Sequence, residues 1–309
     1  MTTNSTEEQT VDPFRCGFVA VVGRPNVGKS TLVNAIVGEK VSITSKKPQT
    51  TRDRILGIVT YEDAQLIFMD TPGFQTQHKS ELTRRMNYTV RTSVTDVDAV
   101  VFVSSATGWK PEDAAVLRLI PNLSKNVIWA INKVDLLKKK EETLFPMAQE
   151  VAKNYHFEAI VPVSAERGTL LEDLVDEIKK LLPPSMPFYD PDAYTDKSPR
   201  FMASEIIREK AFRFLGEELP YGIAVAIESW NEDEHEIVIE ATVYVERESH
   251  KAMVIGEKGS KLKEITYLAR RDIMIALQKP VQVHIWVRVK RGWSNDQRAL
   301  TSLGYDNYG

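Results

Sequence analysis

Apolar and polar residues follow two different patterns along this chain, and the pattern changes near residue 183. Before that point, short β-branched apolar runs alternate with helical patterns; the runs are residues 18–22, 66–69, 99–103, 127–131 and 160–163. Near-continuous apolar strands between helices are typical of a mostly parallel sheet covered on both faces. The pattern therefore predicts an α/β domain over residues 14–182.

The second pattern begins after a proline-rich segment. Residues 183–200 hold five prolines, too many for a central strand or helix, and are predicted to be a linker. Beyond them come a helical pattern at 201–219, strand-like runs at 223–227 and 236–245, a helix at 262–277 and an alternating strand at 281–289. We expect a smaller α+β domain over 201–293 and a C-terminal tail, 294–309, in which no pattern predicts an element.

Composition narrows the class of protein. The net charge of -3 is close to neutral, so any basic surface must be local. Cys16 is the only cysteine and the five histidines have no zinc-site spacing, so we expect a reducing compartment, the cytoplasm, and no structural metal. Residues 1–13 match no targeting segment and are expected to be a disordered tail. No run reaches the roughly 18 apolar residues of a spanning helix.

A phosphate loop follows the first predicted strand. It fits the pattern Gly-x-x-x-x-Gly-Lys-Ser, and its helix continues with Thr31. Its residues are Gly23, Arg24, Pro25, Asn26, Val27, Gly28, Lys29 and Ser30. The glycines let backbone N–H groups point inward, and the helix N-terminus adds positive potential where phosphates would sit. Lys29 is predicted to reach the β- and γ-phosphates and Ser30 to bind Mg²⁺; a plain glycine-rich turn is the alternative.

A second motif would select guanine. The residues Asn132, Lys133, Val134 and Asp135 follow the strand at 127–131. The Asp135 carboxylate can accept from guanine N1–H and its exocyclic amine, whereas adenine presents an acceptor at N1. Asn132 would support the loop, and Lys133 would lie along the base. Alone, Asp135 would read as a helix cap; after a phosphate loop, the motif predicts GTP and GDP as ligands.

The loop after the last strand of the first domain would complete this base pocket. It contains Ser164, Ala165 and Glu166 and is predicted to close over the base through backbone contacts.

Two further segments are predicted to sense the γ-phosphate. Asp70, Thr71, Pro72 and Gly73 follow the strand at 66–69, so Asp70 should hold Mg²⁺ through water and Gly73 should present its amide to the γ-phosphate. Residues 46–54, here called the switch loop, contain Thr50 and Thr51. One threonine should complete the magnesium shell only while the γ-phosphate is present. We prefer Thr51, and Thr50 stays open.

The second domain carries a Gly-x-x-Gly loop with basic neighbours. Residues 247–291 hold eleven Lys and Arg against four Asp and Glu. Glycines permit close approach of a sugar-phosphate backbone, as in KH domains, which clamp about four single-stranded nucleotides. The predicted RNA contacts are Gly256, Glu257, Lys258, Gly259, Lys261, Lys263, Arg270 and Arg271. A solvated helix face is the alternative; the pattern favours a type II KH domain.

Together these motifs resemble the translation-factor branch of P-loop GTPases and, through the second domain, the Era family. The resemblance extends from Phe14 to Tyr305. It implies a GTPase that uses Mg²⁺, binds the 3′ region of small-subunit ribosomal RNA and assists assembly of the small ribosomal subunit, with the pre-small subunit as partner. We expect a monomer in the cytoplasm, and a peripheral contact with the inner face of the plasma membrane stays open.

The residue after Gly73 bears on the rate of hydrolysis. Ras-like GTPases place there a glutamine that orients the attacking water, which Phe74 cannot do. Era-like enzymes share this apolar replacement, and several relatives recruit K⁺ through a phosphate-loop asparagine, the position of Asn26. The resemblance therefore implies slow hydrolysis by Lys29, Thr51, Gly73 and Asn26, with K⁺ supplying charge that an arginine finger otherwise supplies. An ordinary turn residue is the alternative for Asn26.

Two other functions stay open from the residues alone. One is an RNA-binding scaffold that holds GTP as a static ligand. The other is a membrane-associated regulatory GTPase whose helix at 201–219 faces lipid. We expect the apolar residues of this helix and of the next strand to form a core instead; they are Ile206, Ile207, Phe212, Phe214, Leu215, Ile223, Val225 and Ile227.

Overall fold

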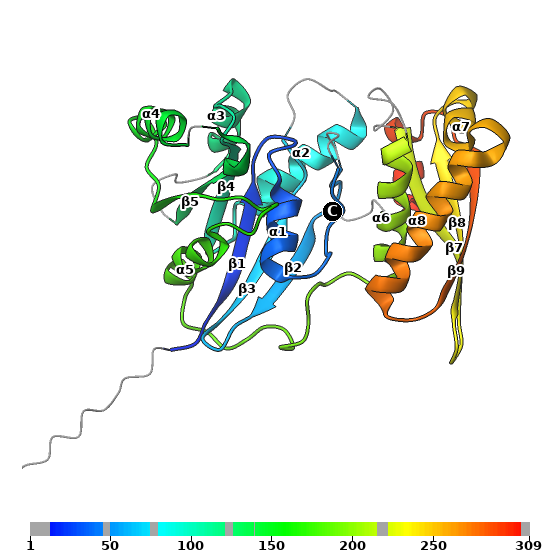
Figure 1. Cartoon of the computed structure of the whole chain (residues 1–309), viewed down its shortest axis with the longest axis horizontal. Helices are drawn as coiled ribbons and strands as arrows, with labels where there is room; N and C mark the ends of the chain where they lie inside the picture. The colour runs from blue at the N-terminus through cyan, green and yellow to red at the C-terminus, as the bar shows by residue number, and fades with distance from the viewer. Residues whose placement is uncertain are drawn as a thin grey trace, which may run out of the picture.

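The computed structural model describes residues 13–45, 50–74, 80–120, 126–138, 140–214 and 222–303. Two sheets form the centres of two domains that lie side by side (Figure 1). Four predicted features fall partly outside the described residues: the N-terminal tail except residue 13, positions 46–49 of the switch loop, the end of the helix at 201–219, and the end of the C-terminal tail.

The first domain is built on a six-stranded sheet of order β2-β3-β1-β4-β5-β6. The strands are β1 (Arg15–Val22), β2 (Ile55–Thr60), β3 (Ala64–Asp70), β4 (Ala99–Ser105), β5 (Val127–Asn132) and β6 (Ala159–Pro162). Of these, only β2 runs antiparallel to its neighbour. The predicted mostly parallel sheet is confirmed, and β2, which pairs with β3 across residues 61–63, was not predicted.

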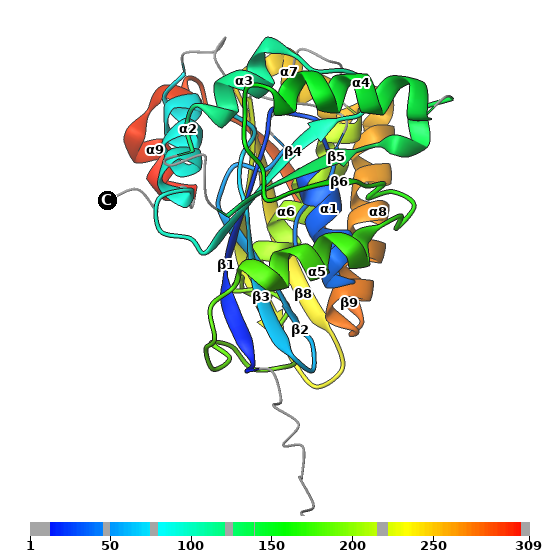
Figure 2. The same ribbon diagram turned by 90° about the vertical axis from the view of Figure 1, so that its left-hand side faces the viewer.

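Helices cover both faces of this sheet (Figure 2). Helices α1 (Lys29–Val37) and α5 (Leu171–Leu181) bury Leu32 and Leu174 in one core. The opposite face carries α2 (Glu81–Ser93), α3 (Pro111–Leu117) and α4 (Lys140–Ala152), around a core that includes Phe102 and Trp129. A short turn of helix, η1 (Val134–Leu136), follows β5. This layering leaves the loops at the carboxyl ends of the parallel strands free to form a site.

The second domain has the predicted order of helix, two strands, helical region and strand. Its elements are α6 (Pro199–Phe214), β7 (Ile223–Glu232), β8 (Ile237–Val245), α7 (Glu248–Ile255), η3 (Glu257–Gly259), α8 (Ser260–Leu277) and β9 (Val281–Val289). Strand β8 lies between β7, to which it is antiparallel, and β9, to which it is parallel. The order of elements and the mixed sheet agree with a type II KH arrangement.

Helix α6 lies on the side of the second domain that faces the first domain, and this explains its composition (Figure 1). The prediction of a core is confirmed for seven of its eight residues: Ile206, Ile207, Phe212, Ile223 and Val225 are buried, and Phe214 and Ile227 are half-buried against them. Leu215 lies outside the described residues. Four charged residues of α6 are buried as well, because the first domain covers this face; they are Glu205, Arg208, Glu209 and Lys210. Among the described residues, no helix has the length and apolar content needed to cross a membrane.

The predicted linker packs against the edge of the first sheet. Ile58 N of β2 donates to Tyr194 O at 3.0 Å, and Leu56 N donates to the Asp196 carboxylate at 3.0 Å. Helix α6 begins at Pro199, inside the span predicted as linker. Proline suits the first turn of a helix, where its missing N–H has no partner to lose.

The C-terminal segment contains two short elements where none was predicted. They are η4 (Trp293–Asn295) and α9 (Gln297–Ser302), and residues 304–309 lie outside the described part of the chain. The Asp296 carboxylate caps α9 by accepting from Arg298 N at 2.9 Å and Ala299 N at 3.1 Å. A helix of six residues depends on tertiary packing, so its sequence pattern is weak.

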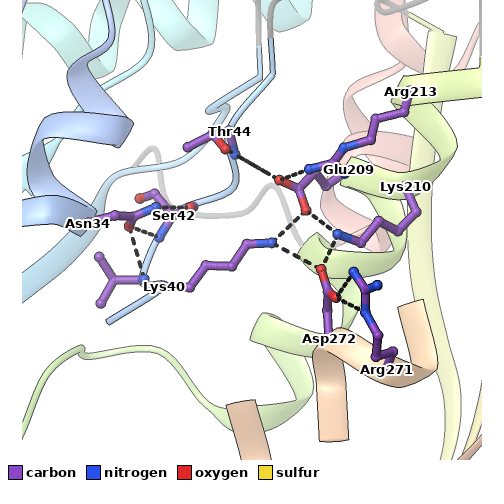
Figure 3. A network of polar contacts seen from close by, with 10 residues as sticks. Asn34, Lys40, Ser42, Thr44, Glu209, Lys210, Arg213, Arg271 and Asp272 are labelled. Atoms are coloured by element: carbon purple, nitrogen blue, oxygen red, sulfur yellow. Dashed lines mark hydrogen bonds and ion pairs between the residues drawn. The ribbon is translucent and has the colours of Figure 1, made fainter. Parts of the chain in front are cut away.

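A charged network joins the domains beside the switch loop (Figure 3). Glu209 of α6 accepts from Lys40 Nζ at 2.6 Å and from Thr44 N at 3.3 Å, and Lys210 pairs with both Glu209 and Asp272. Burial alone would raise the pKa of Glu209, but the ammonium groups of Lys40 and Lys210 lower it overall. The carboxylate therefore stays charged, and removing one partner would leave a buried charge uncompensated.

Candidate nucleotide site and RNA groove

The predicted nucleotide motifs converge at the carboxyl ends of the parallel strands. The phosphate loop follows β1, Asp70 ends β3, Asn132 ends β5, and residues 164–166 follow β6. A hollow at this edge is shared by the phosphate loop, the switch loop and Gly73. It is lined by Pro25, Asn26, Gly28, Lys29, Ser30, Thr31, Ile43, Thr44, Ser45, Thr50, Thr51 and Gly73.

Close packing fixes the shape of the phosphate loop. Gly28 has a φ of 97°, and a Cβ there would lie 2.4 Å from Asn132 Nδ2. A Cβ on Gly23 would lie 2.3 Å from Val103 O. Arg24 holds the loop from outside, because its Nε lies 3.1 Å from the buried Asp113 carboxylate. Only glycine fits at positions 23 and 28 of this loop.

Lys29 lies at the centre of the loop with 7% of its surface exposed. Its Nζ donates to Gly23 O at 3.1 Å and to Arg24 O at 3.2 Å. Burial, with a smaller contribution from the Arg24 guanidinium, lowers the pKa of Lys29 to about 8, although Asp70 opposes the shift. A bound phosphate would favour the charged ammonium and raise this pKa.

We therefore expect GDP binding to take up about half a proton near pH 8, because Lys29 is half charged in the empty site and fully charged beside phosphate. The uptake should shrink toward pH 7, where the empty site already holds the proton. Isothermal titration calorimetry in buffers of different ionisation enthalpy measures it. Binding heats that do not depend on the buffer near pH 8 would contradict the prediction.

Three oxygen-bearing side chains meet next to Lys29. Ser30 Oγ lies 2.8 Å from Thr51 Oγ1, which lies 3.4 Å from Asp70 Oδ2. Asp70 is fully buried, its Oδ1 makes no hydrogen bond, and burial raises the pKa of its carboxyl group. A set of hard oxygen donors with one oxygen unpartnered fits a divalent cation such as Mg²⁺.

The geometry also separates the two threonines of the switch loop. Thr51 is buried and points toward Ser30, whereas the carbonyl of Thr50 accepts from Arg208 Nη2 at 2.5 Å. The contacts therefore bring Thr51, the preferred residue, to the candidate metal site.

Asn132 joins the base-reading loop to the phosphate loop. Its Nδ2 donates to Val27 O at 2.9 Å, and its Oδ1 accepts from Ala165 N at 3.0 Å. Lys133 Nζ donates to Asn26 O at 2.6 Å. The backbone N–H of Ala165 is thus occupied by Asn132, so Ala165 braces this loop within the protein.

Asp135 is exposed beside these residues, where a base could reach it. Ser164 Oγ donates to Asp135 Oδ1 at 2.5 Å, which orients the carboxylate. Val134 is buried, and Glu166 is exposed. The hydroxyl of Ser164 therefore acts as a side-chain partner of Asp135, a contact that the sequence did not predict.

Gly73 and Phe74 contact different parts of the first domain. A Cβ on Gly73 would lie 2.8 Å from Pro25, so the backbone runs directly against the phosphate loop. Phe74 packs against the core under α2 and α3. Asn26 has a φ of 63°, a left-handed conformation that asparagine tolerates better than most residues.

The second candidate site is a groove of about 800 Å³ between α8 and β9, next to the Gly-x-x-Gly loop. The positive φ angles of Gly256 and Gly259, 71° and 79°, shape this loop. The groove is lined by Glu236, Gly259, Leu262, Lys263, Thr266, Tyr267, Arg270, Gln282, Val283, His284, Ile285 and Trp286.

Two aromatic residues of this groove were missed by the sequence reasoning. Tyr267 is 65% exposed and Trp286 46% exposed, with the His284 ring 6.4 Å from the Trp286 ring. Exposed aromatic rings in a basic groove are suited to stacking on single-stranded bases. A signal existed in the sequence, because Trp286 occupies a polar position of the alternating strand at 281–289.

The predicted RNA contacts do not all face this groove. Gly259, Lys263 and Arg270 line it, with Arg270 Nε donating to Val281 O at 2.8 Å. Arg271 instead pairs with Asp272 at the domain interface (Figure 3). Lys261 packs over Gly256, where a Cβ would lie 2.7 Å from the lysine side chain.

Fold and sites together define a P-loop GTPase joined to a KH domain. Family models agree: one described as 50S ribosome-binding GTPase matches residues 18–133, and a KH domain model matches residues 218–294. GTPase Era of Bordetella avium (strain 197N) is 47% identical over 293 residues, which cover 95% of this chain and 98% of that relative. The chain belongs to the Era family of GTPases.

Solved structures extend the likeness to the whole architecture. A crystal structure of Era in complex with MgGDPNP and nucleotides 1506–1542 of 16S ribosomal RNA matches with a TM-score of 0.90 and 40% identity, covering 94% of this chain and 99% of that one. An Aquifex aeolicus Era variant bound to GDP.AlF4- matches with a TM-score of 0.90 and 39% identity, at the same coverage. The predictions of a GTPase and of a KH domain are thereby confirmed.

Proposed function

We propose that this GTPase uses its nucleotide state to control binding of the 3′ region of small-subunit ribosomal RNA, and so assists assembly of the small ribosomal subunit. The main support is the 40% identity, over 94% of the chain, to an Era structure that holds such an RNA together with MgGDPNP. In this proposal residues 14–182 are the GTPase domain, 201–293 bind RNA, and 183–200 link them. The protein would act as a cytoplasmic monomer.

The phosphate site would work mainly by holding the triphosphate. Lys29 would contact the β- and γ-phosphates, and Gly73 N–H would donate to the γ-phosphate. Ser30, Thr51 and Asp70 would hold Mg²⁺, which supplies positive charge to the phosphate oxygens. Phe74, which follows Gly73 and packs against the core, has no polar group that could orient the attacking water, so we infer slow intrinsic hydrolysis.

Potassium should speed this reaction. If Asn26 helps to bind K⁺ near the phosphates, the extra charge should raise the hydrolysis rate about tenfold or more over that in Na⁺. Phosphate release measured in matched salts tests this. In Asn26→Gly, which keeps the left-handed backbone but removes the side chain, the two rates should become equal. Equal rates in the unaltered protein would remove the potassium role.

RNA binding in the groove is tested with a single-stranded oligonucleotide of the 16S 3′ region. Trp286→Ala should weaken binding by about fivefold to a hundredfold, because it removes a stacking surface.

Crosslinking in GTP and in GDP should recover this RNA region mainly in one nucleotide state. Random fragments, or fragments that do not depend on the nucleotide, would contradict nucleotide control.

The alternative of a scaffold with static GTP predicts the same RNA binding but no turnover linked to it. Single-turnover hydrolysis with and without RNA separates the two. A lipid-facing role for α6 is disfavoured, because Ile206, Ile207 and Ala211 are buried in the core of the second domain. Sedimentation with liposomes tests that alternative directly.

A further inference from the structure

Arg52, the residue after Thr51, is anchored in the second domain. It is almost fully buried, and its Nη1 donates to Ile223 O of β7 at 2.5 Å. Its guanidinium lies 5.8 Å from the ring centre of Phe212 and 5.5 Å from that of Trp293. A desolvated guanidinium depends on such carbonyl and ring partners, so the switch loop is held at Arg52 by the other domain.

Trp293 also takes part in a second contact, with the helix that follows Gly73. It is fully buried in a cluster with Leu82 and Met86 of α2 and with Leu300 of α9. In the same region, Glu81 N at the start of α2 donates to Asn295 Oδ1 at 3.3 Å. The segment 293–302, here called the C-terminal clasp, therefore contacts both Arg52, which follows Thr51, and helix α2, which follows Gly73.

We propose that Arg52 and Trp293 are positioning residues for GTP hydrolysis, and that the C-terminal clasp holds the switch loop and α2 in the arrangement that the reaction requires. Neither side chain lines the phosphate hollow, so both act through the groups they hold. The clasp orders two segments before the γ-phosphate meets them, which lowers the entropy cost of reaching the reactive geometry. The inference rests on the proposed role of Thr51.

The test uses the full-length protein and compares kcat for GTP with the affinity for GDP. Arg52→Ala and Trp293→Leu should each lower kcat about tenfold, because a loosened switch loop places Thr51 poorly. GDP affinity should change by less than about twofold, since GDP lacks the γ-phosphate that these segments would meet. Trp293→Phe keeps a ring beside Arg52 and should restore most of the rate.

Two controls separate positioning from folding. Tyr88→Ala truncates an aromatic side chain that is 52% exposed on α2, outside the cluster, and should leave kcat unchanged. Leu300→Ala removes less of the cluster than Trp293→Leu does, and should lower kcat in a protein that stays folded. Rates are compared well below each variant's melting temperature. Arg52→Ala combined with Trp293→Leu should cost less than the two separate losses together, because they share one contact.

The outcomes that overturn the inference are distinct from those that overturn the proposed function. Unchanged kcat in folded Arg52 and Trp293 variants, or GDP affinity that falls as much as kcat, would show a merely structural contact. If Thr51→Ala lowers kcat while those variants do not, the clasp inference fails alone. If Thr51→Ala also leaves kcat unchanged, the proposed role of Thr51 fails.

Discussion

Replacing Lys29 by alanine is expected to weaken GTP binding about a thousandfold, because a charge-assisted contact to each of two phosphates is lost. The ammonium is buried inside the phosphate loop, where few water molecules could replace it. Its removal would also leave Gly23 O and Arg24 O without their donor. Titration with a fluorescent GTP analogue near pH 7 measures the change.

Lys180→Ala is the matched control for Lys29→Ala. Lys180 is exposed on α5 and pairs only with Glu177 among the ion pairs of the described residues, so its loss should leave GTP affinity unchanged. Arginine is a poor replacement for Lys29, because its planar fork does not fit the space of a compact ammonium. A Lys29→Ala protein that binds GTP within about tenfold of the original would exclude the proposed phosphate contact.

The second large effect concerns the base. Asp135→Asn is expected to lower GTP affinity about a hundredfold and to raise the affinity for xanthosine triphosphate. A carboxylate accepts from both guanine donors, whereas a carboxamide offers one acceptor and places an N–H against the exocyclic amine. Xanthine has a carbonyl in place of that amine, and this carbonyl can accept from the asparagine.

This preference is measured by letting GTP and xanthosine triphosphate each displace a fluorescent GTP analogue from the site. Ser164→Ala is an informative companion, because it removes the hydroxyl that orients Asp135 but keeps the carboxylate. We expect it to weaken GTP binding by only about fivefold and to keep the preference for guanine. An Asp135→Asn protein that still prefers GTP would place base recognition elsewhere.

The parts of the fold that the sequence predicts are those determined by residues close together in the chain. Five strands of the first sheet are continuous apolar runs, and the phosphate loop and the guanine motif are contiguous segments at strand ends. The neighbours of Lys29 and Asn132 follow from these placements. Strand β2 was missed because one short run beside a polar loop carries little pattern.

The domain interface could not be predicted, because each side chain in it is buried by residues of the opposite domain. Glu209 and Lys210 look like the solvated side of a helix, yet both are buried once the first domain covers α6. The same holds for Arg52, whose partners Ile223 and Trp293 are far away in the chain. Periodicity describes one element at a time and contains no information about such distant contacts.

The linker between the domains also bears on the solubility of the protein. Strand β2 is the last strand at its side of the sheet, and an uncovered edge strand is a template for pairing with another chain. Here Ile58 N already bonds to Tyr194 O, and Gly57 faces Thr195. The segment that joins the two domains thus also covers part of this edge, so we expect a shortened linker to reduce the solubility of the protein.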